Sequence, residues 1–234
     1  MRIDKLLSEL GICTRREAAK AAKSGGILVD GTPERDPSRH IDPDKNRISF
    51  LGREVTYQKY TYVMLNKPEG YVSATEDGKL PTVIELLPPE LGKIGLFPCG
   101  RLDKNTLGLM LLTNDGDTSH RLLAPKSHVA KTYAFCLKFP FSDADIAALE
   151  AGVDIGGYIT APCTVERTGE REGKITLTEG KYHQIKLMME AVHNQVTYLE
   201  RVSFGPLTLD QALSRGEWRY LSDSEITLLH KKDS

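Results

Sequence analysis

A short polar segment followed at once by an apolar run constrains this chain most. Residues 100–109 read Gly-Arg-Leu-Asp-Lys-Asn-Thr-Leu-Gly-Leu, and the apolar run continues to Leu112 before Thr113-Asn114-Asp115-Gly116. An apolar run bounded by turn residues predicts a buried strand or helix. Asp103 therefore lies between a glycine turn and a buried element, which favours a place in a functional site over that of a casual surface charge.

Length and composition are those of an ordinary globular protein. The 234 residues suffice for one mid-sized domain and a small one, and 40% are hydrophobic and 27% charged. No apolar stretch reaches the roughly 18–20 residues of a membrane helix. The N-terminus lacks the basic-then-apolar pattern of a secretory signal. We therefore expect a cytoplasmic protein without membrane contact.

The residue patterns predict neither a metal nor a cofactor. The cysteines lie far apart and form no C-x-x-C pair: Cys13, Cys99, Cys136 and Cys163. Asp115 and Asp117 lack the distant Glu of a calcium loop and fit a turn that caps the next helix. Neither a G-x-G-x-x-G nor a G-K-[ST] signature occurs.

The first 55 residues have the pattern of a separate small domain. Apolar residues recur at i, i+3, i+4 and i+7 from Ile3 to Leu10, which predicts an amphipathic helix. Thr14-Arg15-Arg16-Glu17 has the form of a capping box opening a second helix, which should end near Lys23. Residues 27–29 predict a strand before the Asp30-Gly31 turn. We expect this domain at 1–55, a linker at 56–60 and a larger domain at 61–234.

The order helix, capped helix, strand and turn resembles the S4 RNA-binding domain, whose helices present basic side chains to RNA phosphates. The resemblance implies six RNA-binding residues: Arg2, Lys5, Arg15, Arg16, Lys20 and Lys23. The formal net charge of −1 requires any RNA-binding surface to be a local basic patch. Arg15 and Arg16 are the strongest candidates, because helix N-terminal amides and guanidinium groups converge there. For a single lysine, a solvated helix face is an equally good interpretation.

From Tyr60 onward, β-prone runs alternate irregularly with helical segments. We predict strands at Ala130–Phe139, Cys163–Arg167, Lys174–Thr178 and Val196–Val202. We predict helices at Thr82–Leu87, Thr118–Leu123, Ser142–Ala151 and His183–Val192. This alternation favours an α+β domain built on a mainly antiparallel mixed sheet with flanking helices.

Several segments of the larger domain match one family in the expected order. They are N-K-P-x-G at 66–70, G-R-L-D at 100–103, K-x-Y at 131–133, G-K-x-H-Q-I-K at 180–186 and a closing strand followed by F-G-P-L at 204–207. Together they resemble the RNA pseudouridine synthases, in particular the branch typified by the small-subunit ribosomal RNA enzyme, the RsuA family. The chain departs from the family at three positions: Lys181 stands where Arg is usual, Leu187 where a second basic residue is common, and Tyr198 where Arg is common.

The resemblance implies a set of catalytic residues. Asp103 would start the isomerisation, Lys186 would pair with it, and the ring of Tyr133 would stack on the reacting base. Arg101 could insert into the space that a flipped nucleotide leaves. Leu199, Ile185 and Cys99 would line the substrate pocket, although a buried apolar role is the plainer interpretation of Cys99. His183 would help to hold its loop and is not placed among the catalytic residues.

The chemistry agrees with these roles. Isomerising uridine breaks the N-glycosidic bond and builds positive charge on the ribose, where a carboxylate can act. A partly buried carboxylate stays ionised only if a cation holds it charged, which Lys186 would do. We expect a cofactor-free, monomeric isomerase acting on ribosomal RNA or a pre-ribosomal subunit, with 16S RNA as the leading target.

Three alternatives remain at this point. The target could be a uridine of 23S RNA, because relatives of the same family act on the large subunit. The chain could be a non-catalytic S4-type RNA-binding or ribosome-assembly protein, in which the segments around Asp103, Tyr133 and Lys186 would have no use. A glycosidic hydrolase would need a second carboxylate, for which Glu179 is the sole weak candidate.

Overall fold

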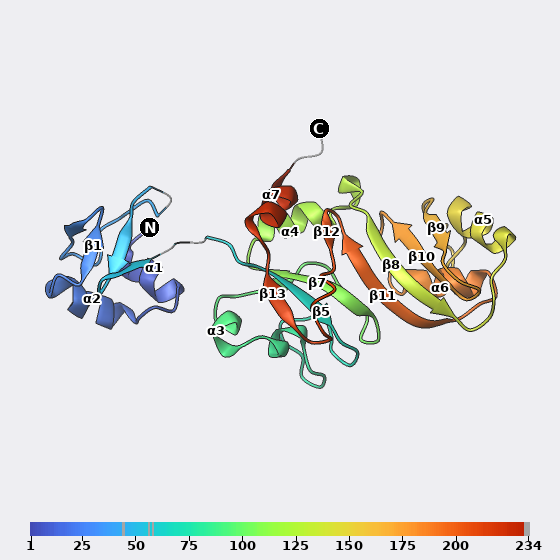
Figure 1. The fold of residues 1–234 in the computed structure, drawn as a ribbon, viewed down its shortest axis with the longest axis horizontal. Coiled ribbons are helices and arrows are strands. Elements are labelled where there is room, and N and C mark those ends of the chain that lie inside the picture. Colours follow the sequence, from blue (N-terminus) through green and yellow to red (C-terminus); the bar gives the residue numbers. More distant parts are fainter. Residues whose placement is uncertain (44, 56, 58, 232–234) are drawn as a thin grey trace. The chain divides into compact units, whose positions relative to one another are not determined.

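The computed structural model describes residues 1–43, 45–55, 57 and 59–231, which form two compact units (Figure 1). The first unit comprises Met1–Tyr60 together with Pro89–Ile94, and the second comprises Thr61–Pro88 and Gly95–Ser234. The expected linker at 56–60 includes two positions, 56 and 58, that lie outside the described residues. Within the described part of the chain, the helices are all too short or too polar to cross a membrane.

The first unit packs two helices, α1 (Ile3–Glu9) and α2 (Arg15–Lys23), with a small sheet. Its described strands lie in the order β2 (Thr32–Pro33), β1 (Ile27–Val29), β3 (Ile48–Phe50) and β4 (Arg53–Val55). Of the apolar positions predicted from their spacing, Ile3, Leu6 and Leu7 are fully buried, and Leu10, just after α1, is partly buried. The predicted capping box is present, since Thr14 and Glu17 each accept a hydrogen bond from the other's backbone amide. Both predicted helices are thus confirmed.

The second unit is built on a large mixed sheet (Figure 1). Along its main path the described strands are β13 (Trp218–Tyr220), β5 (Tyr62–Lys67), β7 (Leu107–Thr113), β11 (Val196–Phe204), β8 (Lys131–Leu137), β10 (Glu172–Leu177) and β9 (Thr164–Arg167). Two short strands, β6 (Phe97–Pro98) and β12 (Leu207–Thr208), pair with β7 and β11. Among these pairs β7 and β11 run parallel and the others antiparallel, which confirms the predicted mainly antiparallel sheet.

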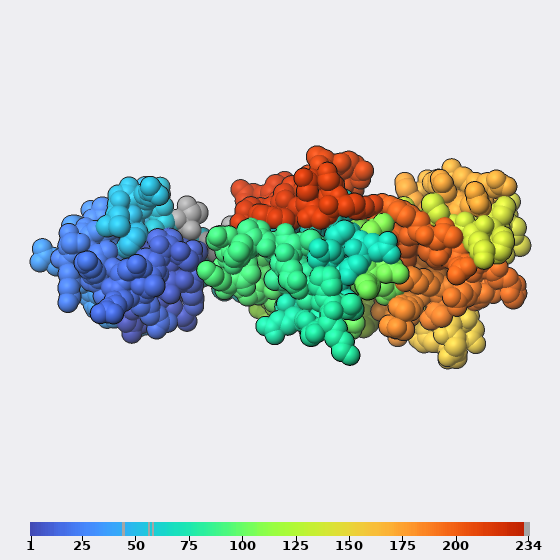
Figure 2. All heavy atoms as spheres, turned by 90° about the horizontal axis from the view of Figure 1, so that it is seen from below, coloured from blue at the N-terminus to red at the C-terminus, as the bar shows by residue number. Residues whose placement is uncertain are grey.

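Helices flank this sheet. They are η1 (Val83–Leu86), α4 (Gly116–Leu123), η2 (Pro125–Ser127), α5 (Asp143–Ala151), α6 (Gln184–Ala191) and α7 (Asp223–His230), with the one-turn α3 (Pro89–Gly92) grouped in the other unit. The helix expected at Thr82–Leu87 is wrong in type: the structure forms a 3-10 helix, at whose start the Glu85 carboxylate accepts from the Thr82 amide at 2.9 Å. Asp115 caps α4 by accepting from the Thr118 amide, as the turn interpretation predicted. The C-terminal segment, red in the space-filling view, lies beside the cyan and green segments (Figure 2), and its strand β13 pairs with β5.

The two halves of the sheet meet where β7 and β11 approach closely. Gly108 has φ +95°, and a Cβ at this position would lie 2.3 Å from the Arg201 carbonyl oxygen. Only glycine fits there without moving backbone. Arg215 braces the same junction, because its Nη1 donates to the side chains of Asn66 on β5 and Glu200 on β11. The start of β7, and with it the preceding Asp103 loop, is therefore held in place from both sides.

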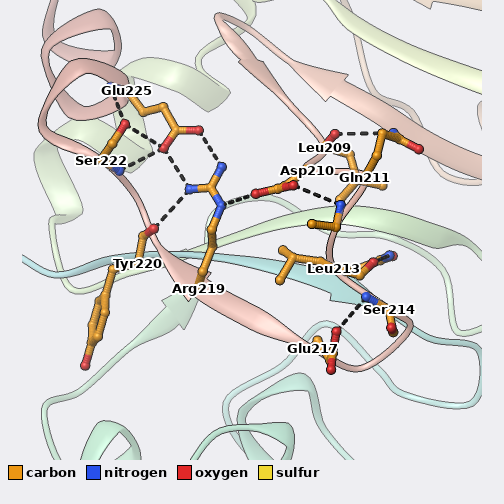
Figure 3. A network of polar contacts seen from close by, with 12 residues as sticks. Leu209, Asp210, Gln211, Leu213, Ser214, Glu217, Arg219, Tyr220, Ser222 and Glu225 are labelled. Carbon is orange, nitrogen blue, oxygen red and sulfur yellow. Dashed lines mark hydrogen bonds and ion pairs between the residues drawn. The ribbon is translucent and has the colours of Figure 1, made fainter.

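A polar network around Arg219 ties the C-terminal helix to the sheet (Figure 3). Its guanidinium donates to both carboxylate oxygens of Glu225 at 2.8 Å and to Asp210 at 2.6 Å. Glu225 also caps α7, accepting from the Ser222 amide. The hydrogen bonds from Arg219 come first among the causes that lower the pKa of Glu225 to about 2. Bidentate pairing of this kind is stronger than an ordinary surface ion pair.

This network predicts an acid-sensitive contribution to stability. Because the folded-state pKa of Glu225 is about 2 and its ordinary value 4.5, the contribution is complete above pH 4.5 and is lost as the pH falls towards 2. At pH 7 it amounts to at most about 3 kcal/mol, less after solvent screening. Arg219→Met should therefore lower the unfolding free energy at pH 7, and the deficit should shrink progressively below pH 4.5.

Urea unfolding followed by the fluorescence of Trp218 measures this directly, since Trp218 is the one tryptophan of the chain and precedes Arg219. Arg171→Met, which removes an exposed arginine outside the network, serves as the control. If Arg219→Met lowered the unfolding free energy equally at pH 7 and pH 3, the ion pair between Arg219 and Glu225 would not be the source of this stability.

Candidate active site

Asp103 lies in the loop between β6 and β7, and this loop is fixed by its own neighbours. Ser73 holds Leu102 twice: its hydroxyl donates to the Leu102 carbonyl at 2.8 Å and accepts from the Leu102 amide at 3.0 Å. The Thr106 amide donates to the Asp103 carbonyl at 3.0 Å and closes the turn. The Asp103 side chain is 27% exposed, so its carboxylate opens towards solvent from a rigid backbone.

Lys67, at the end of β5, anchors the loop from beneath. Its side chain is fully buried, and its Nζ donates to the carbonyls of Pro68, Lys104 and Thr106 at 2.9–3.2 Å. Burial lowers the pKa of Lys67 to about 8, and the nearby Asp103 carboxylate opposes that shift. Lys67 belongs to the N-K-P-x-G segment, for which no chemical role was predicted. Its three carbonyl contacts identify it as the residue that shapes the Asp103 loop.

Two nitrogens from the segment that opens α6 face the Asp103 carboxylate. Lys186 Nζ lies 2.7 Å from Oδ2, and His183 Nε2 lies 3.5 Å from Oδ1. Lys186 is on the first turn of α6, and His183 occupies the N-cap position with φ +51°. The loop residue His183 therefore also contacts the carboxylate, which sequence reasoning did not predict. The H-Q-I-K spacing was the available signal, because it places His183 one turn from Lys186.

Glu179 fixes the entry to α6. Its carboxylate accepts hydrogen bonds from Gln184 Nε2, the Ala161 amide and the Tyr158 hydroxyl at 2.5–2.9 Å. Gln184 Oε1 in turn accepts from the Lys181 amide at 2.8 Å. Glu179 therefore braces two loops, and none of the described interactions joins it to Asp103. With these partners Glu179 does not provide the second free carboxylate that a glycosidic hydrolase would need beside Asp103.

Tyr133 on β8 lies over the core beside α6. It is half-buried and packs against a cluster that includes Ile185 and Leu199, which are themselves nearly buried. Ile185 directly precedes Lys186, so the structure brings this aromatic ring to the same side of the sheet as the Asp103–Lys186 pair. Arg101, two residues before Asp103, is exposed, and no salt bridge joins it to any described residue.

Cys99 lies inside the core. Its side chain has no exposed surface, and burial raises the pKa of its thiol. Its burial supports the apolar interpretation, and a place in the substrate pocket stays a prediction. Among the residues that the structure describes, no group of three or more His, Cys, Asp or Glu side chains could hold a metal ion.

The basic candidates of the first unit fall into two groups. Arg2 and Lys5 are engaged in ion pairs with Asp4 and Glu9. The other four lie exposed on α2, and within the described ranges none of them forms a salt bridge: Arg15, Arg16, Lys20 and Lys23. This helix is thus the stronger candidate for phosphate contact.

The fold and the sequence both have known counterparts. A solved structure of a pseudouridylate synthase matches with a TM-score of 0.69 and 35% identity, covering 98% of this chain and 99% of the other. The family model for RNA pseudouridylate synthase matches residues 61–191. The chain belongs to the RNA pseudouridine synthase family. A second model, that of the S4 domain, matches residues 1–45.

Two curated relatives span the whole length. An uncharacterized RNA pseudouridine synthase of Bacillus subtilis, YtzG, is 48% identical over 99% of both chains. The ribosomal small subunit pseudouridine synthase A of Vibrio cholerae is 37% identical over 99% of this chain and all of the relative. The protein is thus an isomerase that acts on RNA, with an N-terminal S4 domain, as the motifs indicated.

Proposed function

We propose that this pseudouridine synthase isomerises one uridine of small-subunit ribosomal RNA, with Asp103 as the residue that acts on the ribose. The observation that carries the assignment of Asp103 is its 2.7 Å ion pair with Lys186 on a rigid, partly exposed loop. The choice of RNA is supported by full-length relatives that carry the name ribosomal small subunit pseudouridine synthase A. We further propose domains at 1–55 and 61–234 joined by 56–60, a monomer in the cytoplasm, and no metal or cofactor.

The reaction rearranges bonds without a net change of atoms. The bond between the ribose C1′ and uracil N1 breaks, and its electron pair leaves with the base. The ionised Asp103 acts on the electron-poor ribose, either by attack on the sugar carbon or by removing a sugar proton. The uracil then rotates, its C5 bonds to C1′, and the C5 proton is replaced by one at N1. Lys186 and His183 hold the carboxylate, and Tyr133 offers its ring to the base.

Access to the uridine requires that it leave the base stack. Flipping a nucleotide out of paired RNA costs a few kcal/mol, and stacking on an aromatic ring returns about 1–3 kcal/mol per base. Tyr133 is the ring that receives the base in this proposal. Arg101, exposed beside Asp103, occupies the vacated space and pairs with the phosphates around it.

Mapping of pseudouridines in ribosomal RNA tests the target. A strain lacking the protein should lose one pseudouridine in 16S RNA, and the wild-type gene should restore it while an Asp103→Asn allele should not. Loss of a 23S position instead would assign the enzyme to the large subunit. An unchanged modification map would show that the enzyme acts on an RNA other than ribosomal RNA and would overturn the proposed target.

The S4 domain predicts a measurable salt effect. Its expected contribution is phosphate contact, which releases counterions and so steepens the dependence of affinity on salt. Removing residues 1–55 should weaken binding to 16S RNA and flatten that dependence, while turnover of a saturating short substrate persists. Arg15→Ala with Arg16→Ala should reduce the slope of log affinity against log salt by about 1.4–1.8.

Lys45→Ala is the matched control, since Lys45 is a highly exposed lysine of the same unit outside α1 and α2. Affinity and slope are measured by titration of labelled RNA at several salt concentrations. If truncation abolished turnover yet left affinity and slope unchanged, the N-terminal domain would belong to the active site and the proposed division would be wrong.

A further inference from the structure

An exposed rim borders the Asp103 site. It consists of three largely apolar side chains, Tyr158, Ile159 and Tyr182, together with Lys181. Tyr182 and Ile159 are 78% and 72% exposed, which makes them the most exposed large apolar side chains of the described residues, and Tyr158 is 40% exposed. Rings and branched side chains left in water at one place mark a surface for a ligand or partner.

This rim is rigid. Residues 154–159 form a tight hairpin with Gly156 and Gly157 at its tip, both at positive φ, and the Asp154 carboxylate accepts from the Gly157 amide. Glu179 then joins this hairpin to the segment before α6 through the Tyr158 hydroxyl. The rim is therefore a formed surface and does not require ordering when a ligand binds.

Tyr182 connects the rim to the catalytic carboxylate. Its ring stacks on the His183 imidazole, with ring centroids 3.8 Å apart and planes 19° apart. His183 in turn lies 3.5 Å from Asp103. One face of the Tyr182 ring is thus covered by imidazole, and its exposure leaves the other face open to solvent. A ligand on that face would be linked to the Asp103 carboxylate through two contacts, Tyr182 on His183 and His183 on Asp103.

The charges of the rim select the kind of ligand. Lys181 Nζ lies 4.3 Å above the Tyr158 ring, so an ammonium group lies on one exposed ring of the rim, and Lys181 directly precedes Tyr182 in the chain. Alternating π-faces and cations are the means by which proteins hold single-stranded nucleic acid, with bases on the rings and phosphates on the cations. An apolar protein segment would use the rings and leave the ammonium group unpaired.

We propose that this rim binds the single-stranded nucleotides next to the target uridine, with the neighbouring base stacked on the open face of Tyr182. The inference rests on the proposed function, because it takes the uridine over Asp103 as the reference point. The rim then supplies affinity for unpaired RNA beside the reacting nucleotide and favours target sites in loops over those in helices. The phosphate of the same nucleotide lies against Lys181.

The test uses the full-length chain carrying Asp103→Asn, so that binding is measured without turnover. The probe is a nine-nucleotide single-stranded oligouridylate with one 2-aminopurine, whose fluorescence is quenched when it stacks. Tyr182→Ala should weaken binding about 5- to 150-fold and abolish the quenching, while Tyr182→Phe should retain both. Tyr220→Ala, which removes a 55% exposed tyrosine on β13, should change neither.

Unchanged affinity and quenching in Tyr182→Ala would overturn the proposal. If the same substitution then lowered only the turnover rate of the Asp103 enzyme, the ring would serve solely to hold His183. Failure of the proposed function has a different signature: the wild-type enzyme would form no pseudouridine in small-subunit RNA, whatever the oligonucleotide shows. The melting temperatures of all variants are measured as well, so that unfolding can be excluded as the cause of any loss of binding.

Discussion

Replacing Asp103 with asparagine should reduce pseudouridine formation to the uncatalysed background. The amide keeps the shape of the side chain and can still accept a hydrogen bond from Lys186, but it carries no negative charge. Without that charge it neither attacks the sugar carbon nor stabilises positive charge on the ribose. The loss should exceed that of every other single substitution in the site, because the remaining residues act through this carboxylate or on the base.

The measurement is nucleoside analysis of 16S RNA after incubation with purified enzyme. The loop around Asp103 is held by Ser73 and Lys67 through backbone carbonyl and amide groups, so the variant should fold and melt like the wild type. Asp117→Asn, at an exposed position in the first turn of α4, is the matched control and should keep full activity. Substantial pseudouridine formation by the folded Asp103→Asn protein would remove Asp103 from the reaction.

Replacing Lys186 with methionine should have the second largest effect, a rate loss of several orders of magnitude. Its ammonium lies 2.7 Å from Asp103 Oδ2, and removing it takes away the nearest cation that holds the carboxylate in place. His183 at 3.5 Å is a weaker substitute, because it is charged only when protonated. Methionine keeps the length and apolar stem of lysine, so the first turn of α6 should remain intact.

Two companion variants sharpen this result. Lys186→Arg retains the charge and should keep part of the activity, whereas Lys181→Met removes an exposed cation five residues away that lies over Tyr158. Single-turnover rates at saturating RNA separate chemistry from binding. Equal and mild losses for Lys186→Met and Lys181→Met would show that the ion pair with Asp103 contributes little to the reaction.

Local sequence patterns located most of the secondary structure. The i, i+3, i+4 apolar spacing in α1, the capping box of α2 and the Asp115 cap of α4 all depend on residues within one or two turns of each other, and the structure forms each of them. Strands such as β8 and β10 were found within two residues of their ends. The strand β13 and the helix α7 were not predicted. A three-residue strand has too little periodicity of its own, and β13 exists because it pairs with β5.

For the site, the sequence by itself determined the family, the two-domain character and the identity of the residues that we expect to react. Motifs such as G-R-L-D and H-Q-I-K carry this information because the reaction requires particular groups at fixed local spacings. Tertiary structure alone decided two further points: Lys67 beneath the Asp103 loop and His183 against the carboxylate. Each depends on side chains between 36 and 80 positions apart or on the packing of whole strands. Burial and contact between distant segments are properties of the assembled sheet, and no local pattern of residues encodes them.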